Sequence, residues 1–532
     1  MPRAVSLIFL LFSLALIAFF VFFNAINHPF VHDDVVFIVQ NPQIGHLDHL
    51  LNLFFQSSNP QRVAGVNSYY RPVLEIFYRL EYRLFGFHAA GFHFINILIH
   101  VLNGLLLCIV LCRLQFSQWL AYSISLLFLI HPIQSEAVAC VSGISNLLTA
   151  FFILLTLYYY IRGRYVLTFV GLVLALFTKE QAIILVPLLV LIDWYQQKKD
   201  RGGLWFVFSI VTLVFLWLRS SITGAHLLED VLQSPVELKL RLLSIPRTIL
   251  MYLRLIVFPY DLHYYRNTDI LAPNGPAFIM LGALSVALIW LVKKLQMNSR
   301  EIIFGVTWFV ISLLPVLNII PIINEYSFIL TAEHFLYLPM VGVVIVLALI
   351  IKRLVSFQVL VAIEIFICLG LGLQTVYQNT FWRGEIPLFQ RTVALEKDFA
   401  RGHMLLAKAY FFNKQEDMAI AQYNQALTIM KGYEKKAVND KARQFYKSFI
   451  KEIYADMAQC FIVKGRFDKA IDALNCTLVI DPKNVGLLNN LAICYIQQGD
   501  KAQAEQILKM ALGLDPTYIP ARNNLKQLMK EN

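Results

Sequence analysis

The stretch Phe30-Val31-His32-Asp33-Asp34 follows shortly after the first long apolar run of the chain, residues 4–24. Two adjacent carboxylates and an imidazole therefore stand where a membrane-spanning helix is expected to end, at a boundary between lipid and water. Charged groups at such a place are expensive unless they are solvated or paired. The stretch predicts a polar site at one membrane face, with the other apolar runs arranged as helices around it.

The composition supports a membrane location. Of the 532 residues, 58% are hydrophobic and only 15% are charged, whereas a soluble domain is about 45–50% apolar and about 25% charged. The apolar residues come in long uncharged runs of spanning length. The first run is too long for a signal-peptide core of about 7–15 residues, so we interpret it as a retained span. The sequence predicts an all-α fold that begins with a polytopic membrane helical bundle.

The net charge of +11 does not indicate nucleic-acid binding. Lys and Arg gather in short loops between the apolar runs, which is the usual cytoplasmic bias of membrane proteins. The seven cysteines form no CxxC pair and show no metal-ligand spacing. We expect neither a disulfide framework nor a partner nucleic acid.

About eleven spans are predicted within a domain of residues 1–380. They lie near residues 4–24, 92–112, 118–131, 137–161, 165–178, 181–193, 203–219, 277–293, 302–317, 335–351 and 355–377. The basic loops can all be cytoplasmic only if the N-terminus is cytoplasmic too. The loop with Asp33 and the C-terminal tail are then both outside. Residues 245–258 are expected to be an interfacial or re-entrant helix, and residues 44–57 another surface helix.

The tail, residues 398–532, has a 34-residue period. Ala470 and Ala504 are 34 positions apart, as are Leu474 and Leu508, while Pro482 and Pro516 close two units at the same offset. This period with small residues at fixed points predicts tetratricopeptide repeats (TPR), about three of them followed by a capping helix. An insert of about 17 residues separates the first copy from the second. Such a solenoid usually binds a peptide or a protein on its concave face.

Ionisable groups at the ends of apolar runs are the candidate site residues, because each is costly there without a function. Asp33 and Asp34 are the candidate catalytic residues, one of them as a general base; helix capping in water is the alternative. The predicted substrate-binding residues are His32, Tyr70, Arg71, His93, Asn96, His100, His131, Glu136, Lys179, Glu180, Glu333, His334 and Tyr337. Arg71 suits a phosphate or one of the carboxylates.

Each of these residues also has a purely structural interpretation. His93, Asn96 and His100 could simply bond neighbouring helices, and Lys179-Glu180 could neutralise each other. The histidines lack a carboxylate at matching spacing, so no metal site is predicted, although a divalent metal stays an open alternative. By the predicted topology, however, the polar turns open to the same side as Asp33.

An external pocket with acids and scattered cations suits a lipid-linked donor. A phosphate leaves as an anion, so it needs cations near it, whereas an acceptor hydroxyl needs a base such as Asp. These are the requirements of glycosyl transfer from a polyprenyl phosphate, whose prenyl tail would lie between the spans. No cofactor other than this donor substrate is expected.

Several motifs stand in a fixed order along the chain. They are Phe-Val-His-Asp-Asp at 30–34, Tyr-Tyr-Arg-Pro at 69–72, Gly-Phe-His-Phe-Ile-Asn at 91–96, His-Pro-Ile-Gln-Ser-Glu-Ala at 131–137, Lys-Glu-Gln at 179–181 and Ala-Glu-His-Phe-Leu-Tyr-Leu-Pro at 332–339. Together with the repeats, the set resembles the transmembrane and tetratricopeptide-repeat (TMTC-type) O-mannosyltransferases of the GT-C class. Family members more often have an aromatic residue where this chain has His32, and Arg where it has His334.

The resemblance implies inverting transfer of a hexose, with mannose expected, from a dolichyl- or polyprenyl-phosphate to Ser or Thr hydroxyls of a protein. The small number of repeats favours a prokaryotic relative, in the bacterial inner membrane with the repeats in the periplasm. For a eukaryotic chain, the bundle is expected in the endoplasmic reticulum membrane and the repeats in its lumen. Two alternatives stay open at this point: transfer to a surface glycan or lipid, and a non-catalytic TPR scaffold in the membrane.

Overall fold

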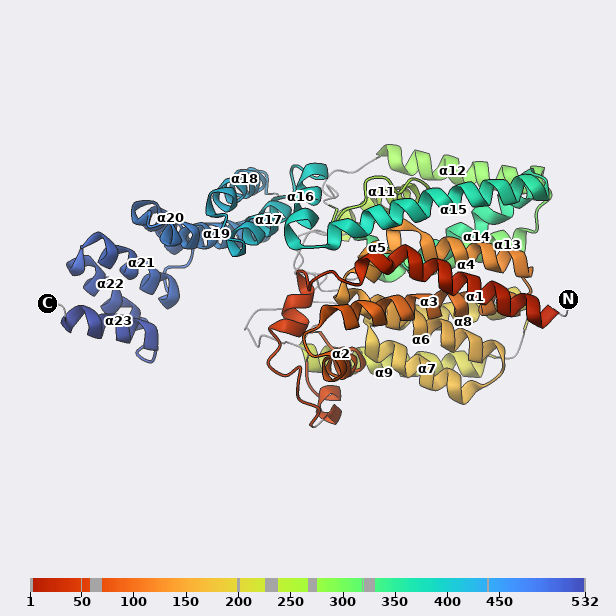
Figure 1. Ribbon diagram of the computed structural model, residues 1–532, viewed down its shortest axis with the longest axis horizontal. Helices are drawn as coiled ribbons and strands as arrows, with labels where there is room; N and C mark the ends of the chain where they lie inside the picture. The colour runs from red at the N-terminus through yellow and green to blue at the C-terminus, as the bar shows by residue number, and fades with distance from the viewer. Residues whose placement is uncertain are drawn as a thin grey trace. The chain divides into compact units, whose positions relative to one another are not determined.

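The computed structural model describes residues 3–48, 50–57, 69–198, 201–224, 238–266, 275–317, 319, 331–437 and 440–530. Most of these residues are helical, and the one β-type pairing among them is a single antiparallel bridge between Arg266 and Thr331. The predicted all-α fold is therefore confirmed. The chain divides into two compact units that separate between Leu388 and Phe389, and each is described here by itself (Figure 1).

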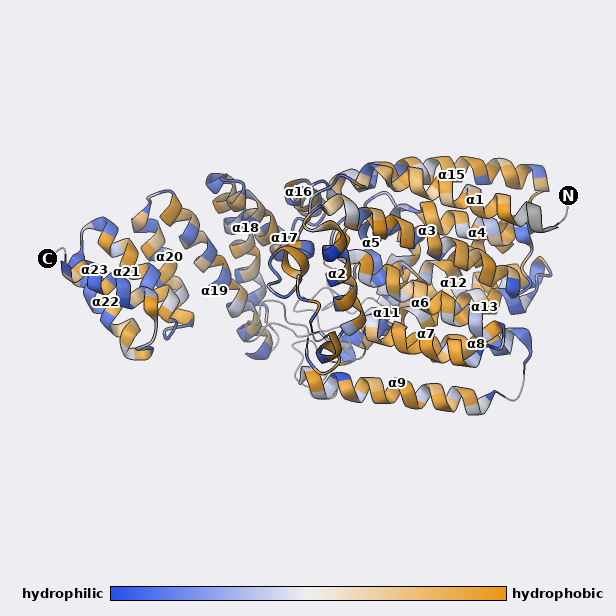
Figure 2. Ribbon diagram, turned by 60° about the horizontal axis from the view of Figure 1, so that its bottom comes forward, coloured by the Kyte–Doolittle hydropathy of each residue, from blue (hydrophilic) through white to orange (hydrophobic). Residues whose placement is uncertain are grey.

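The first unit is a bundle of apolar helices. They are α1 (Arg3–Phe22), α2 (Pro72–Phe85), α3 (Ala89–Arg113), α4 (Gln118–Ile130), α5 (Ser135–Ala139), α6 (Ile144–Ile161), α7 (Tyr165–Thr178), α8 (Leu185–Gln196), α9 (Gly202–Thr223), α11 (Leu238–Val257), α12 (Gly275–Lys294), α13 (Ser299–Leu313), α14 (Pro339–Leu354) and α15 (Phe357–Asn379). Figure 2 shows that these helices consist mostly of hydrophobic residues, and many large ones, such as Phe9, Trp217 and Phe366, are exposed. An outer surface of this kind is what lipid requires.

Each of the eleven predicted spans contains a helix of this bundle. Seven helices among the described residues are long and apolar enough to cross a membrane: Ile8–Ala25, Ala89–Arg113, Val141–Ile161, Gly202–Thr223, Gly275–Lys294, Ser299–Val316 and Phe357–Arg383. Two further apolar helices, α4 and α7, are shorter. The multi-pass membrane bundle is thus supported, while the number of eleven spans stays a prediction.

One expected surface helix differs from the prediction, while the interfacial or re-entrant position expected for residues 245–258 stays a prediction. The region 44–57 contains only a short 3₁₀ helix at Leu50–Phe54, with Leu51 and Phe55 largely exposed, so the expected helix over the whole region is wrong. The apolar segment 245–258 forms most of α11 and buries Tyr252 and Leu255.

α13 and α14 pack closely against each other through two glycines. A Cβ atom built on Gly342 would lie 2.3 Å from the carbonyl oxygen of Gly305 and 2.7 Å from the backbone nitrogen of Phe309. Small residues are what allow two helix backbones to approach this closely in a membrane.

We expect Gly342→Ala to destabilise the protein, because both obstructing atoms are backbone and the helices must move apart. Overpacking of this kind costs about 1–3 kcal/mol, which would appear as an earlier thermal unfolding midpoint in detergent. Gly282→Ala on α12 is the matched control, since nothing lies within 4 Å of its added Cβ. Equal midpoints for the two variants would contradict the packing argument.

The second unit consists of paired helices followed by a single one. They are α17 (Ala400–Phe412), α18 (Glu416–Lys435), α19 (Asp440–Val463), α20 (Phe467–Ile480), α21 (Val485–Gln498), α22 (Lys501–Leu514) and α23 (Ile519–Lys530). Ala458, Ala470, Ala492 and Ala504, two pairs separated by the 34-residue period, are fully buried where helices meet. The predicted repeats are confirmed, and α23 lies where the capping helix is expected. The insert is taken up by α18 and α19, which are 20 and 24 residues long, while α20, α21 and α22 have 14 each.

α16 (Glu385–Leu395) lies at the division between the units.

Candidate active site

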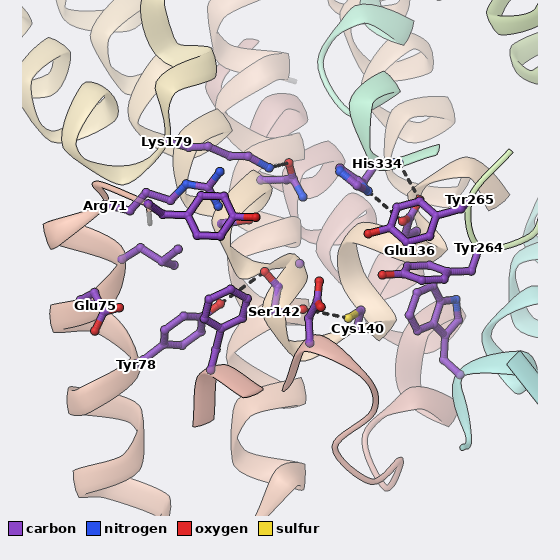
Figure 3. A pocket seen from close by; sticks show the side chains of 18 residues that line it. Arg71, Glu75, Tyr78, Glu136, Cys140, Ser142, Lys179, Tyr264, Tyr265 and His334 are labelled. Carbon is purple, nitrogen blue, oxygen red and sulfur yellow. Dashed lines mark hydrogen bonds and ion pairs between the residues drawn. The ribbon is translucent and has the colours of Figure 1, made fainter. Parts of the chain in front are cut away.

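A cavity of about 90 Å³ lies where the loops of the first unit converge (Figure 3). Its lining comes from widely separated parts of the chain: Asp33, Phe37, Tyr69, Arg71, Leu74, Glu75, Tyr78, Glu136, Cys140, Ser142, Gly143, Ser145, Asn146, Lys179, Tyr264, Tyr265, His334 and Trp382. Five of the predicted site residues are among them, namely Asp33, Arg71, Glu136, Lys179 and His334. The ends of the predicted spans therefore do meet around one polar space.

The two adjacent aspartates have different environments. The Asp33 side chain lines the cavity, is 44% exposed, and lies 3.3 Å from Nε2 of His32. Asp34 is fully buried and accepts hydrogen bonds from the backbone nitrogens of Val31 (3.1 Å), Val141 (3.3 Å) and Ser142 (2.6 Å). Only Asp33 is therefore accessible to a substrate in this cavity.

Asp34 instead fixes the first loop to the segment before α6. Burial raises the pKa of its carboxyl, and the backbone hydrogen bonds from Val31 and Ser142 offset part of that rise. The thiol of Cys140 also points toward it, with Sγ 3.4 Å from Oδ1. The loop that carries Asp33 is thereby held in a fixed position.

Asp34→Ala is expected to lower the free energy of unfolding by about 3 kcal/mol, because several buried backbone N–H groups lose their acceptor at about 1–3 kcal/mol each. Denaturant or thermal unfolding in detergent would measure this loss. Asp48→Ala, an exposed acid on the same loop, should change stability by less than about 0.5 kcal/mol. A similarly stable Asp34→Ala protein would show that these bonds do not hold the loop.

Arg71 and Glu180 form a two-pronged ion pair inside the protein. Arg71 Nε donates to Oε2 of Glu180 at 3.0 Å and its terminal nitrogen donates to Oε1 at 2.6 Å. Burial alone would raise the pKa of Glu180, but the charges of Arg71, Arg219 and Lys179 more than offset it and lower the pKa to about 2. The Arg71 guanidinium also stacks over Tyr69, 4.4 Å from the ring centre.

Lys179 does not pair with its neighbour Glu180, contrary to the self-neutralising interpretation. Its ammonium donates to Oδ1 of Asn146 at 2.8 Å. Lys179 lines the cavity and so brings an ammonium group to its wall, and its charge also acts on nearby Glu180. Figure 3 shows Lys179 and Arg71 reaching in from the same side.

Glu136 holds His334 on another side of the cavity. Oε2 of Glu136 accepts from the backbone nitrogen of His334 at 2.8 Å, and Oε1 lies 2.7 Å from its Nδ1. Burial would raise the pKa of Glu136, but the His334 charge and hydrogen bonds offset it, and the pKa is lowered. Because an ionised carboxylate only accepts, Nδ1 donates and the other ring nitrogen, Nε2, is the one left for a ligand.

Glu333 lies behind the cavity and secures one of its loops. Its Oε1 accepts from the backbone nitrogen of His263 at 2.7 Å and from Arg266 at 3.0 Å. Burial raises the pKa of Glu333 to about 8, with Arg266 lowering it and Glu136 raising it further. The contacts position Tyr264 and Tyr265, which line the cavity.

Aromatic side chains form the wall beside Asp33. The Tyr264 ring lies 3.9 Å from that of Tyr265, 5.7 Å from Trp382 and 5.2 Å from His32, centre to centre. His32 and Tyr265 both have positive φ, 49° and 58°. Non-glycine residues rarely adopt this conformation, and such strain gathers at functional sites.

The other predicted site residues lie outside the cavity. Asn96 donates to the carbonyl oxygens of Val138, Cys140 and Val141, so it supports the segment that holds Asp34. His100 and Asn103 both bond Tyr337. His131 Nε2 lies 2.9 Å from the Ile256 carbonyl oxygen. His93 is buried against the ring of His28. The Tyr70 hydroxyl donates to the carbonyl oxygen of Phe54.

Sequence reasoning missed several cavity residues. Cys140, Ser142, Asn146 and Trp382 come from apolar or apparently ordinary segments, so nothing in their local pattern distinguishes them from packing residues. Tyr264 and Tyr265 had a signal in the sequence, since they stand beside the polar residues Asp261 and His263. No group of three or more His, Cys, Asp or Glu that could hold a metal ion occurs in the described parts of the chain.

The structure defines a helical membrane protein with a polar cavity at the helix ends and a TPR solenoid. Two tetratricopeptide repeat models match, one at residues 400–430 and one at residues 477–529. Among solved structures, the crystal structure of MamA protein is 21% identical and covers 25% of this chain and 62% of that chain, with a TM-score of 0.21.

Curated relatives along the chain are protein O-mannosyl-transferases. F38B6.6 of Caenorhabditis elegans is 28% identical over 443 residues, 80% of this chain and 63% of the relative. TMTC3 of Mus musculus is 22% identical over 470 residues, 76% of this chain and 49% of the relative. Tmtc1 of Drosophila melanogaster is 30% identical over 176 residues, 31% of this chain and 20% of the relative. The resemblance to TMTC-type proteins is confirmed, and the matches span 63% and 49% of the length of the first two relatives.

Proposed function

We propose that the chain is an integral-membrane glycosyltransferase that transfers a hexose, expected to be mannose, from a polyprenyl- or dolichyl-phosphate to Ser or Thr hydroxyls of a protein. The observation that supports this most directly is the meeting of the partly exposed carboxylate of Asp33 with Arg71, Lys179 and His334 around a single cavity. The names of the curated relatives support the sugar and the protein acceptor.

In this proposal Asp33 is the general base. Its carboxylate takes the proton of the acceptor hydroxyl while the hydroxyl oxygen forms a bond to C1 of the sugar. The bond between C1 and the phosphate oxygen breaks, its electron pair stays with the polyprenyl phosphate, and the configuration at C1 inverts. The Asp33 carboxyl then releases its proton to water.

The cations stabilise the charge that develops on the leaving phosphate. Lys179 lies in the wall with its ammonium 2.8 Å from Oδ1 of Asn146, and Arg71 lines the same cavity while paired with Glu180. Preorganised charges of this kind favour the transition state because they need no rearrangement as the phosphate leaves. The aromatic wall of Tyr264, Tyr265 and Trp382 suits the apolar face of a sugar ring.

The test is transfer of radiolabelled mannose from polyprenyl-phosphate mannose, by the full chain in liposomes, to an extract of secretory or periplasmic proteins. Label in protein bands supports the proposal, and the same label in the presence of EDTA excludes a required divalent metal. If the label appears only in a glycan or lipid fraction, the acceptor is a glycan or lipid and not a protein. If no sugar is transferred from any prenyl-linked donor, the protein is a non-catalytic scaffold and the proposal is wrong.

The proposed orientation places the N-terminus in the cytoplasm, with Asp33 and the repeats on the extracytoplasmic side. This orientation follows from the basic loops, which in membrane proteins usually lie on the cytoplasmic side. We assign catalysis to the domain of residues 1–380 and acceptor binding to the domain of residues 398–532. A membrane-impermeant thiol reagent should label a cysteine added after residue 532 in vesicles that keep the outside face outward. Labelling only after permeabilisation would reverse the orientation.

A further inference from the structure

A second cavity, of about 330 Å³, lies between α4, α14 and α15, and the proposed reaction does not use it. It sits where α4 and α15 begin and α14 ends, since Trp119 and Phe357 contact there with ring centres 5.5 Å apart. The active-site cavity is at the other ends of these helices, where Thr375 bonds the Ile130 carbonyl. From Glu364 to Gln378 the axis of α15 rises about 20 Å, so the two cavities are separate.

The second cavity is mostly apolar and about twice the size of an engineered cavity of about 150 Å³ that binds benzene. Leu120, Leu127, Ile363 and Ile367 are among its lining residues. Its walls are therefore suited to a segment of an alkyl chain.

Two polar atoms inside this apolar lining make no hydrogen bond of ordinary length and angle with the described residues, although Glu364 lies close to Trp119 and Ser123. They are Oε1 of Glu364 and Nε1 of Trp119, both buried. Glu364 lies two turns into α15, about 10 Å from its start, where an ionisable group is a functional candidate. The ester groups of a glycerolipid accept hydrogen bonds, and the indole N–H of Trp119, with Glu364 beside it in the lining, is a donor placed to bind them.

The mouth of the cavity is basic. Lys352 lines it with an exposed side chain, and Arg353 and Arg113 stand at the same ends of the helices. Basic pockets between membrane helices bind the headgroups of anionic lipids. Charge at the mouth, hydrogen-bonding groups below it and an apolar interior follow the order of headgroup, ester and acyl chain in a phospholipid.

We propose that this cavity binds an anionic glycerophospholipid, with its phosphate at Lys352, its ester region at Trp119 and Glu364, and one acyl chain in the apolar interior. The site is independent of the transferase reaction. It places a specific lipid against α15, whose far end leads to Trp382 in the active-site wall.

The test uses phosphatidylglycerol and phosphatidylcholine, each carrying a photoreactive diazirine in an acyl chain, with the full-length protein in liposomes. Mass spectrometry should map the cross-links to residues 117–127 and 357–367. Phosphatidylglycerol should label these peptides about fivefold more, since one basic residue near an anionic headgroup contributes about 1 kcal/mol.

Lys352→Glu should abolish that preference, and Ala348→Phe, which fills the cavity, should abolish the cross-links. Lys294→Glu is the matched control, because Lys294 is equally basic but lies over Trp290 on α12 and does not line the cavity. Size-exclusion profiles would show whether each variant is folded. If Ala348→Phe misfolds, Lys352→Glu still tests the proposal, because Lys352 is exposed and its replacement should not disturb the fold. Equal labelling by both lipids, labelling unaffected by Lys352→Glu, or no labelled peptide in these ranges would overturn the proposal.

Discussion

Asp33→Asn is expected to reduce sugar transfer by about 10²–10⁴-fold, the usual contribution of a positioned general base. Asparagine has the same shape as aspartate but cannot accept the proton of the acceptor hydroxyl. Because Asp33 is 44% exposed, its replacement should leave the thermal unfolding midpoint unchanged. Initial rates of mannose transfer, at saturating donor, would measure the loss.

The control for this variant is Asp48→Asn, an exposed acid of the same loop that does not line the cavity. It should keep full activity. If the folded Asp33→Asn variant still transfers the sugar, Asp33 is not the general base. Loss of both activity and stability would instead place Asp33 among the structural groups, as we argue for Asp34.

The second large effect is expected from Arg71→Met, which leaves the buried Glu180 without its main counter-charge. Breaking a buried pair in this way costs about 3–5 kcal/mol, because the remaining carboxylate stays in an apolar environment. The double variant Arg71→Met/Glu180→Leu should recover much of this loss, since no buried charge is left. Denaturant unfolding in detergent would measure both free energies.

The exposed pair of Asp440 and Arg443, with side chains 97% and 49% exposed, provides the comparison. Arg443→Met should change stability by less than about 1 kcal/mol, as surface pairs do. A small effect of Arg71→Met, similar to that of Arg443→Met, would contradict the role assigned to the buried pair.

The same ion pair predicts a pH dependence. Since the pKa of Glu180 falls from 4.5 to about 2, its ionisation stabilises the folded protein by about 3 kcal/mol at neutral pH. That contribution is complete above about pH 4.5 and is lost as the pH falls through 2. The Glu180→Leu part of the double variant removes this slope, which acid-unfolding curves would show.

The helices and repeats could be predicted because their signals are local. Apolar runs define the bundle, and the 34-residue spacing of buried alanines such as Ala470 and Ala504 defines the solenoid. The region 44–57 was predicted as one helix from its apolar spacing. Only a 3₁₀ helix forms there, so local periodicity was overridden by the surrounding structure.

The site could be predicted only in part, because its pairings join distant residues. Adjacent charges suggested that Lys179 and Glu180 neutralise each other, whereas Glu180 pairs with Arg71, 109 positions away. The two aspartates look equivalent in sequence. Their difference depends on backbone groups of Val141 and Ser142, more than 100 positions further on.

The active-site cavity takes residues from Asp33, just after the first helix, to Trp382, just after the last helix of the bundle. At a synthesis rate of about 5–20 residues per second, roughly 20–70 seconds separate the appearance of these two side chains. Throughout that time the nascent chain has its carboxylate but lacks part of its aromatic wall. The cavity lining is therefore complete only after α15 and the residues that follow it have been synthesised.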